Sequence, residues 1–256
     1  MRLLSERKHR RREGAFVVQG IQPVWQAVEA GADIEVLIVA PGLLRHPGAA
    51  AMVSAQETAG VRVARLSDEL FGRLGDRDGP SGLAAIVRCA DLLLADLRPG
   101  PGAVIAALHH VGNPGNLGTI IRTASAAGAA GVVLIGPSAD PYDPAAVKAS
   151  MGALFTVPVA AASATEFLRW AAGSGVRVVA ASGHARLFCW DADLRPPMAL
   201  LFGSEGAGLP DDLLNAAEMR VAIPMTGSAE SLNLAVAAGI LLYEVRRRTG
   251  MPAPKS

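Results

Sequence analysis

Three segments carry the residues of this sequence that could do chemistry. They run from Asn113 to Ala124, from Leu201 to Pro210 and from Ile223 to Ala235. Each places glycines and polar side chains directly after a short apolar run that is typical of a strand. Glycines let a backbone approach a ligand closely, and ligands of parallel sheets bind at the carboxyl ends of the strands. The three segments therefore predict binding sites at the carboxyl edge of a sheet.

Arg122 stands out in the first segment because its neighbours on the expected helix are apolar. Ile120, Ile121 and Ala124 surround it, so we expect a largely buried helix and a guanidinium that needs an anionic partner. That partner could be an internal carboxylate or a bound ligand, and the spacing favours neither. Asn116, six residues earlier, is expected to cap the same helix.

The other two segments each allow a functional and a purely structural interpretation. Glu205 is the only charged residue among the glycines at 203, 206 and 208, which could form a ligand loop or a tight turn with a solvated carboxylate. Ser231 and Asn233 begin a predicted helix, whose amino-terminal amides favour polar ligands but also need ordinary capping. Neither segment on its own distinguishes a ligand-binding role from a purely structural one.

Several other chemistries lack their motifs. There is no Gly-x-x-x-x-Gly-Lys-Ser/Thr phosphate loop and no Gly-x-Gly-x-x-Gly after the first strand of either half. The sequence around Ser204 lacks the Gly-x-Ser-x-Gly spacing of serine hydrolases. His109 and His110 end a predicted strand, so we expect them to point to opposite faces, and no Cys/His cluster accompanies them. We therefore expect no metal site.

The elements that must position these segments form two α/β halves. In the first half we predict strands at 16–18, 34–39, 61–64 and 83–87 and helices at 23–30, 48–59 and 67–74. In the second half we predict strands at 103–108, 131–135, 155–159, 176–181, 199–202 and 221–223, and helices at 117–127, 144–149, 164–172, 210–217 and 230–248. This alternation predicts a mainly parallel sheet covered on both faces.

The stretch from Asp91 to Gly102 separates the two halves. It ends in two Pro-Gly steps, which favour turns over a helix or a ladder. We place the domain boundary there and assign residues 1–95 to one domain and residues 96–256 to the other.

The composition is that of an α/β protein. Of the 256 residues 51% are hydrophobic but only 4% are aromatic, so the core must be built mainly from Ala, Val and Leu. The longest strongly apolar stretch, Leu234 to Tyr243, is shorter than the roughly 20 residues that span a bilayer. The first residues have no apolar signal core, and Cys89 and Cys189 are far apart in sequence. We therefore expect a cytoplasmic protein without a membrane segment.

The charge is unevenly distributed along the chain. Residues 1–12 carry a charge of +5, which leaves −4 for the remainder of a chain whose net charge is +1. A basic arm on a slightly acidic body suits a polyanionic partner, although a solvated chain end would show the same pattern. The candidates for contacts with such a partner in this arm are Arg7, Lys8, Arg10, Arg11 and Arg12.

As a set and in this order, the three segments resemble the signature motifs of the SpoU/TrmH class of RNA 2′-O-ribose methyltransferases, in the SPOUT superfamily. The matching patterns are Asn-x-Gly-x-x-x-Arg from Asn116, Phe-Gly-x-Glu-Gly from Phe202, and Ile-Pro-Met followed by Ser-Leu-Asn from Ile223 to Asn233. The resemblance covers about 103–248. The front half is similar to the ribosomal-protein-like α/β RNA-binding domain of many members, except that Gln19-Gly20 stands where Glu-Gly is more usual.

The resemblance implies a fold, a cofactor and partners. It implies a parallel sheet with a deep trefoil knot at its C-terminal end, S-adenosyl-L-methionine as the methyl donor, and a homodimer whose active site draws on both subunits. The substrate would be a ribose 2′-hydroxyl of a structured RNA, with ribosomal RNA favoured over transfer RNA because of the separate front domain.

The resemblance also assigns roles to residues. Arg122 would act at the hydroxyl, and because arginine stays protonated we prefer phosphate binding and alkoxide stabilisation to general-base catalysis. Asn116, Glu205, Ser231 and Asn233 would shape the catalytic site. The cofactor would be held by Ser182, Gly183, Leu201, Phe202, Gly203, Ser204, Glu205, Gly206, Ile223, Pro224, Met225, Ser231, Leu232 and Asn233.

Two functions from other classes remain as alternatives. One is a non-catalytic RNA-binding protein that retains the fold, which is disfavoured because every candidate catalytic side chain is present. The other is a nucleotide-dependent oxidoreductase, which is disfavoured because the dinucleotide fingerprint is missing.

Overall fold

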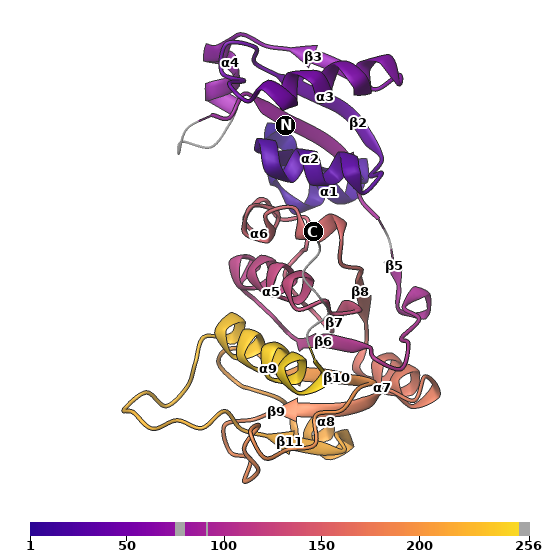
Figure 1. Cartoon of the computed structure of the whole chain (residues 1–256), viewed down its shortest axis with the longest axis vertical. Coiled ribbons are helices and arrows are strands. Elements are labelled where there is room, and N and C mark those ends of the chain that lie inside the picture. Colours follow the sequence, from indigo (N-terminus) through magenta and orange to yellow (C-terminus); the bar gives the residue numbers. More distant parts are fainter. Residues whose placement is uncertain (75–79, 91, 251–256) are drawn as a thin grey trace. The chain divides into compact units, whose positions relative to one another are not determined.

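The computed structural model describes residues 1–74, 80–90 and 92–250, and these form two compact units (Figure 1). The first unit comprises Met1–Ala90 and Asp140–Thr156, and the second comprises Asp91–Ala139 and Val157–Ser256. Residues 140–156 thus belong to the first unit, although in sequence they lie between the two parts of the second. A single boundary at residue 95 does not separate the two units.

The first unit is built on a four-stranded mixed sheet with the strand order β1-β4-β2-β3. Strands β1 and β2 run antiparallel to β4, whereas β3 is parallel to β2. The four predicted strands of this half and its three predicted helices are confirmed, with shifts of one or two residues at most of their ends. The elements are η1 (Arg2–Ser5), α1 (Arg7–Glu13), β1 (Ala15–Gln19), α2 (Ile21–Glu29), β2 (Ile34–Val39), α3 (Pro47–Thr58), β3 (Arg62–Arg65), α4 (Asp68–Leu74), β4 (Leu83–Arg88), α6 (Pro144–Ser150) and η3 (Ala153–Phe155).

Residues 140–156 supply part of the core of this unit. Val147 of α6 belongs to the same buried cluster as Phe16 and Val18 of β1. The ring of Phe16 lies 4.5 Å from that of Tyr142 and 6.1 Å from that of Phe155. The apolar side chains of residues 140–156 therefore pack against the first sheet and complete its core.

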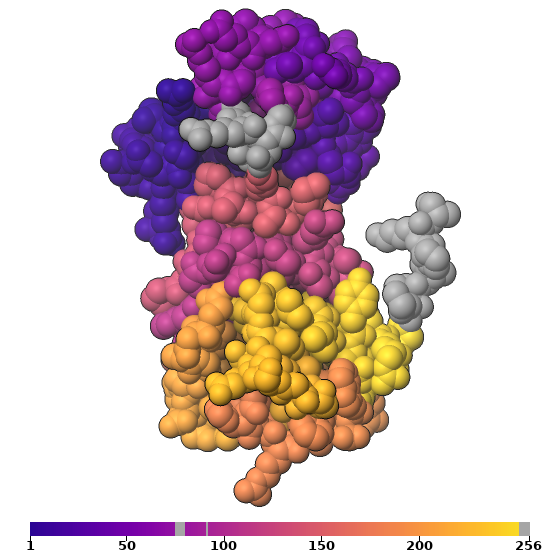
Figure 2. All heavy atoms as spheres, turned by 90° about the vertical axis from the view of Figure 1, so that its left-hand side faces the viewer, coloured from indigo at the N-terminus to yellow at the C-terminus, as the bar shows by residue number. Residues whose placement is uncertain are grey.

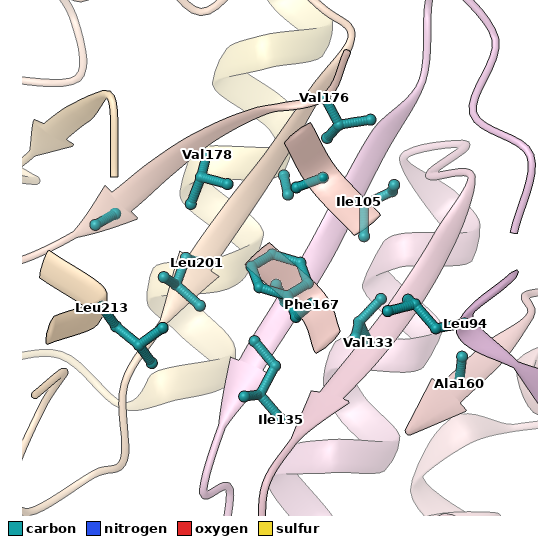
Figure 3. Close-up of a cluster of buried hydrophobic side chains, with 14 of the residues drawn as sticks. Leu94, Ile105, Val133, Ile135, Ala160, Phe167, Val176, Val178, Leu201 and Leu213 are labelled. Carbon is teal, nitrogen blue, oxygen red and sulfur yellow. The ribbon is translucent and has the colours of Figure 1, made fainter. Parts of the chain in front are cut away.

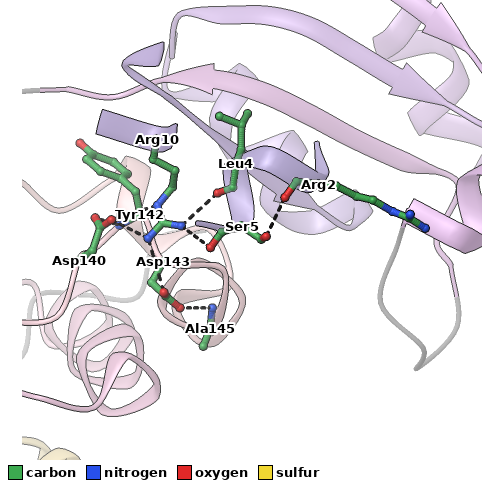
Figure 4. A network of polar contacts seen from close by, with 8 residues as sticks. All are labelled: Arg2, Leu4, Ser5, Arg10, Asp140, Tyr142, Asp143 and Ala145. Carbon is green, nitrogen blue, oxygen red and sulfur yellow. Dashed lines mark hydrogen bonds and ion pairs between the residues drawn. The ribbon is translucent and has the colours of Figure 1, made fainter. Parts of the chain in front are cut away.

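Arg10 ties the N-terminal residues to residues 140–156 (Figure 4). Its side chain is only 2% exposed, and the guanidinium donates through Nη2 and Nε to Asp140 Oδ2, at 2.7 and 3.0 Å. Nη1 donates to the carbonyls of Leu4 and Ser5 at 3.0 and 2.8 Å. Nη2 also lies 3.5 Å from the carboxylate of Asp143. A buried cation needs such partners, so Arg10 is an internal structural residue and, unlike the other four predicted residues of the arm, is not placed to contact RNA.

The second unit is built on a seven-stranded sheet with the order β11-β9-β10-β6-β7-β8-β5. Every ladder described in it is parallel, which confirms the predicted α/β architecture. The elements are β5 (Leu92–Leu93), η2 (Leu94–Asp96), β6 (Val104–His109), α5 (Pro114–Ala126), β7 (Gly131–Ile135), β8 (Val159–Ala162), α7 (Ala164–Gly173), β9 (Arg177–Ala181), β10 (Met198–Phe202), α8 (Asp211–Ala216), β11 (Met219–Val221) and α9 (Leu234–Thr249).

Helices cover both faces of this sheet, as predicted. On one face Ile105, Val133 and Leu201 pack with Phe167 of α7 and Leu213 of α8 (Figure 3). Helices α5 and α9 pack against each other and against strands of the sheet. All residues of β6 from 104 to 108 are buried, as expected for a strand that is covered on both sides.

Several predicted boundaries in this unit are wrong. The helices predicted at 117–127 and 230–248 begin at Pro114 and Leu234, so Ser231 precedes the last helix. The strand predicted at 155–159 lies at Val159–Ala162, because Phe155 ends a 3-10 turn that packs on the first unit. The strand predicted at 221–223 lies at Met219–Val221. The expected linker contains strand β5, which pairs with β8, and its Leu94 and Leu97 join the core of the second unit. Within the described residues, no helix is long and apolar enough to cross a membrane.

Candidate functional site

The three chemically interesting segments lie at one edge of the seven-stranded sheet. Strands β11, β9, β10 and β6 are consecutive neighbours and parallel, so their carboxyl ends share that edge. The first segment follows β6, the second follows β10 and the third follows β11. Residues 182–183 follow β9 at the same edge. Segments far apart in the sequence are thereby brought together.

Asn116 is the centre of a hydrogen-bonded cluster that joins all three segments. Its Nδ2 donates to Glu205 Oε1 at 2.6 Å. Its Oδ1 accepts a hydrogen bond from Nδ2 of Asn233 at 3.1 Å. An amide side chain that donates on one side and accepts on the other has its orientation fixed by both partners. Three of the five residues predicted for the catalytic site are in direct contact in this cluster.

Local capping explains how the two asparagines are presented. Helix α5 begins at Pro114, and its N-cap is Asn113, whose Oδ1 accepts from the Asn116 N–H at 3.1 Å. The prediction that Asn116 caps this helix is therefore wrong, and its side chain is left to form the cluster. Asn233 caps α9 by accepting from the N–H of Ala235 at 2.8 Å, while its Nδ2 reaches Asn116.

The loop that carries Glu205 is closed by its own backbone. The Ser204 N–H donates to the Gly208 carbonyl and the Gly208 N–H donates to the Ser204 carbonyl, both at 3.1 Å. A Cβ atom at Gly203 would overlap the backbone of Gly208, and Gly208 has a φ of 68°. Glycine at 203 is therefore required by a close approach of the chain to itself. A Cβ at Gly206 would meet open space.

Arg122 is exposed, contrary to the expectation that its helix would be buried around it. The buried face of α5 is formed by Leu117, Ile120 and Ile121, and Arg122 lies off that face. Within the described residues Arg122 makes no hydrogen bond or ion pair, so the internal carboxylate that the sequence left open is not found there. The structure brings Asn116, Glu205 and Asn233 together and records no contact between them and Arg122.

The remaining predicted residues differ in how much surface they offer. Met225 and Leu232 are 40% and 37% exposed, which is high for large apolar side chains. Ser182 accepts a hydrogen bond from the His184 N–H at 3.3 Å, and Ser231 is exposed. Leu201 and Phe202 are fully buried in β10, so they could offer a ligand little besides backbone. Gly183, Gly203, Ser204, Gly206, Ile223 and Pro224 complete the edge.

The edge suits a ligand that is largely uncharged. It offers exposed apolar side chains, backbone groups and a glycine loop, and the carboxylate of Glu205 is already engaged by an amide. A purine nucleoside needs apolar contacts and a few backbone hydrogen bonds and no countercharge. The residues present therefore fit an adenosine-bearing ligand.

A stacked histidine pair at the end of β6 was not anticipated. The rings of His109 and His110 have centroids 4.0 Å apart and an angle of 14° between their planes. The prediction of opposite faces is wrong because His110 has a φ of 53° and so leaves the strand conformation. Burial, and then the neighbouring His110, lower the pKa of His109, although Asp212 opposes the shift. The described residues contain no group of three His, Cys, Asp or Glu that could hold a metal ion.

Comparisons with known proteins give a consistent result. Residues 103–243 match the model of the SpoU rRNA Methylase family, and residues 1–85 match the MRM3-like substrate binding domain. The chain is 35% identical over 255 residues to a 23S rRNA (uridine(2479)-2′-O)-methyltransferase of Streptomyces viridochromogenes, covering 96% of this chain and 87% of the relative. It is 30% identical over 243 residues to the 23S rRNA (guanosine(2553)-2′-O)-methyltransferase RlmP of Bacillus subtilis, covering 95% and 93%.

Solved structures agree with these sequence matches. The AdoMet-bound rRNA methyltransferase from Sinorhizobium meliloti superposes with a TM-score of 0.89 at 37% identity, covering 96% of this chain and 92% of that one. The SpoU methyltransferase AviRb from Streptomyces viridochromogenes, in complex with AdoMet, gives a TM-score of 0.86 at 32% identity, covering 96% and 95%.

The closed loop at 203–208 makes a specific prediction about two glycines. Gly203→Ala should destabilise the protein by about 1–3 kcal/mol because the new methyl group cannot be placed without moving the Gly208 backbone. Gly206→Ala, three residues away in the same loop, should have a much smaller effect because its Cβ meets open space. Urea denaturation of both variants measures the difference, and equal destabilisation would contradict the loop geometry.

Proposed function

The chain belongs to the SpoU rRNA methylase family, and from this premise we propose that it methylates a ribose 2′-hydroxyl of 23S ribosomal RNA. It is an S-adenosyl-L-methionine-dependent RNA 2′-O-ribose methyltransferase, with the family model covering residues 103–243. The observation that carries the proposal is the Asn116–Glu205–Asn233 cluster, which joins all three motifs in one place. The assignment to 23S rRNA rests on relatives that match nearly the whole chain and are named for that substrate. A non-catalytic RNA-binding protein is not favoured, because it would have no use for this cluster.

We propose that the cofactor lies along the edge formed by residues 182–183, 201–206, 223–225 and 231–233. When bound, S-adenosyl-L-methionine supplies a methyl group on a sulfonium centre. Met225 and Leu232 would contact its adenine, since both expose apolar surface at this edge. Gly206 leaves room beside Glu205 for close approach by the ligand.

We assign the handling of the ribose to Arg122 and the amide cluster. An exposed guanidinium that no carboxylate of the described chain neutralises is suited to bind the phosphate next to the target ribose. The same cation would stabilise the negative charge that develops on the 2′-oxygen as its proton leaves. Asn116, Glu205 and Asn233, with Ser231, act as positioning residues. The hydrogen bonds of Asn116 with Glu205 and Asn233 fix side chains from two helix starts and one loop, and such positioning lowers the barrier.

We further propose that the protein is a homodimer with the knotted fold of its family, and that α9 contributes to the interface. Leu234, Leu241 and Leu242 of α9 are buried within their own subunit. Val236 and Tyr243 are 50% and 44% exposed and lie seven residues apart, so they share one face of the helix. Figure 2 shows the yellow C-terminal region at the surface. Exposed apolar side chains on one helix face are typical of a subunit contact.

The RNA would also be held by α1, where four of the predicted basic residues are accessible. Arg7, Lys8, Arg11 and Arg12 are exposed, and the indigo N-terminal region forms part of the surface in Figure 2. Lys8 and Arg12 pair with exposed neighbouring glutamates, and such pairs are weak enough to exchange for phosphate. We propose that residues 1–95, to which the structure adds residues 140–156, bind the RNA, and that the rest of 96–256 carries out catalysis. We also propose that the protein acts in the cytoplasm.

Arg122→Ala should abolish methyl transfer and leave S-adenosyl-L-methionine affinity within a few-fold of wild type. The reason is that the guanidinium acts on the RNA and the 2′-oxygen and not on the cofactor. Transfer of radiolabelled methyl groups to deproteinised 23S rRNA and calorimetric titration of the cofactor measure the two effects. Arg169→Ala removes an exposed arginine from α7 and serves as the control. Activity lost only in proportion to unfolded protein would contradict the assignment.

The dimer makes its own prediction. The wild-type protein should sediment at micromolar concentration with twice the 26.3 kDa mass of one chain. Val236→Glu should shift it toward monomer, because burying an unpaired carboxylate at an interface is costly. Leu70→Glu places the same charge at a comparably exposed leucine of α4 and should leave the dimer intact. A wild-type monomer would defeat the proposal.

Replacing Arg7, Lys8, Arg11 and Arg12 together with glutamine should weaken RNA binding and flatten its dependence on salt. Each phosphate contact contributes roughly 0.7–0.9 to the slope of log affinity against log salt, so the loss should be about 3 if all four residues contact phosphates. Cofactor affinity should stay constant. Arg10 is retained because the fold needs it. An unchanged slope would show that α1 is merely solvated.

A further inference from the structure

The loop between β9 and β10 carries an exposed surface that has no role in the function described so far. Every second residue from His184 to Trp190 is exposed, and the four are a His, an Arg, a Phe and a Trp. Phe188 and Trp190 are 46% and 48% exposed, whereas Cys189 between them is fully buried. We call His184, Arg186, Phe188 and Trp190 the loop surface. Neighbouring large aromatic side chains that the fold leaves in solvent make it a candidate binding surface.

The backbone beneath the loop surface is anchored at several points. The Ala222 N–H donates to the Leu187 carbonyl at 2.9 Å, and the Cys189 N–H donates to the Ala222 carbonyl at 2.8 Å. Arg248 of α9 donates through Nη2 to the carbonyls of Cys189 and Trp190. The exposed rings are therefore attached to a fixed backbone. A preformed surface loses less conformational freedom when it binds a ligand.

The loop surface lies next to the edge proposed for the cofactor. It follows residues 182–183 directly in the chain, and Phe188 pairs with Ala222 in a parallel bridge. Residues 182–183 belong to that edge, and Ala222 immediately precedes Ile223, which belongs to it as well. An RNA that brings its target ribose to the edge must therefore pass close to the loop surface with its neighbouring nucleotides.

Arg186 adds a positive charge between the rings. Within residues 1–74, 80–90 and 92–250 it makes no hydrogen bond or ion pair, and residues 183–190 contain no Asp or Glu. Asp191, the next residue after the loop surface, forms no ion pair with Arg186. Single-stranded nucleic acids are bound by this combination, because unpaired bases stack on aromatic rings while phosphates contact arginine.

We propose that the loop surface binds a single-stranded segment of the RNA substrate next to the target ribose. Bases stack on Trp190 and Phe188, and Arg186 contacts a phosphate. The inference rests on the proposed function, because that function brings RNA to the adjoining edge. RNA is favoured over a second copy of this chain because Arg186 has no carboxylate partner among the described residues and the surface adjoins the site that the RNA must reach.

Tryptophan fluorescence tests the stacking directly, because Trp190 is one of three tryptophans and the other two, Trp25 and Trp170, are less exposed. Deproteinised 23S rRNA, added without cofactor, should quench the emission of the wild-type protein. A fully paired RNA duplex should not, since its bases are stacked inside the helix. Trp190→Phe keeps an aromatic ring, so it should lose most of the quenching and keep RNA affinity within about threefold of wild type.

Trp190→Ala should weaken the affinity for 23S rRNA about fivefold or more, because a stacked base loses its partner. Arg186→Gln should reduce the slope of log affinity against log salt by roughly 0.7–0.9. Arg169→Gln, which removes an exposed arginine from α7, is the matched control and should leave the slope unchanged.

Three results would overturn the inference. They are quenching that survives in Trp190→Phe, RNA affinity of Trp190→Ala within about twofold of wild type, and a shift of Trp190→Ala toward monomer in sedimentation, which would assign the surface to a subunit contact. The fluorescence titration needs no methyl transfer. A wild-type protein that binds RNA through Trp190 but transfers no methyl group would therefore defeat the proposed function and leave this RNA site standing.

Discussion

The pair of hydrogen bonds made by the Asn116 side chain is the interaction on which the site depends. Its partners, Glu205 and Asn233, lie 89 and 117 residues away in sequence. They can meet only because β6, β10, β9 and β11 are parallel neighbours whose carboxyl ends share one edge. The long apolar strands, the helices that cover them and the caps of α5 and α9 all serve to hold these polar groups within hydrogen-bond distance. An isolated amide side chain at a helix start would adopt several orientations. The Asn116 amide is held in one orientation, because its nitrogen and its oxygen each have a hydrogen-bond partner.

Several residues whose types suggested ligand binding turn out to be used by the chain itself. Gly203 is required by the backbone of Gly208. Arg10, chosen from sequence as an RNA contact, neutralises Asp140 inside the first unit. Arg122 shows the reverse, since it was expected to be buried and is exposed. Residue type indicates what a side chain can bind, but burial decides whether its partner is internal or external.

The sequence predicted the fold well wherever the pattern was local. The strands at 34–39 and 131–135 were placed at the observed residues because each is a continuous apolar run between turn residues. The strand at 155–159 was misplaced because Phe155 is apolar for another reason, which is its contact with Phe16. Asn113 and Asn116 are both plausible caps by spacing, and only the geometry separates them. The placement of residues 140–156 in the first unit depends on contacts between segments that are distant in sequence, and such contacts leave no periodic signal.

The distribution of charge separates the recognition of the two ligands. The edge proposed for the cofactor contains one carboxylate, Glu205, which accepts a hydrogen bond from the Asn116 amide and so holds that side chain in place. Positive charge is instead found on α1 and at Arg122, on residues that lie outside the proposed cofactor edge. The uncharged adenosine part of the cofactor and a polyanion can therefore be bound by one chain without competing for the same side chains, and changes in salt should weaken RNA binding much more than cofactor binding.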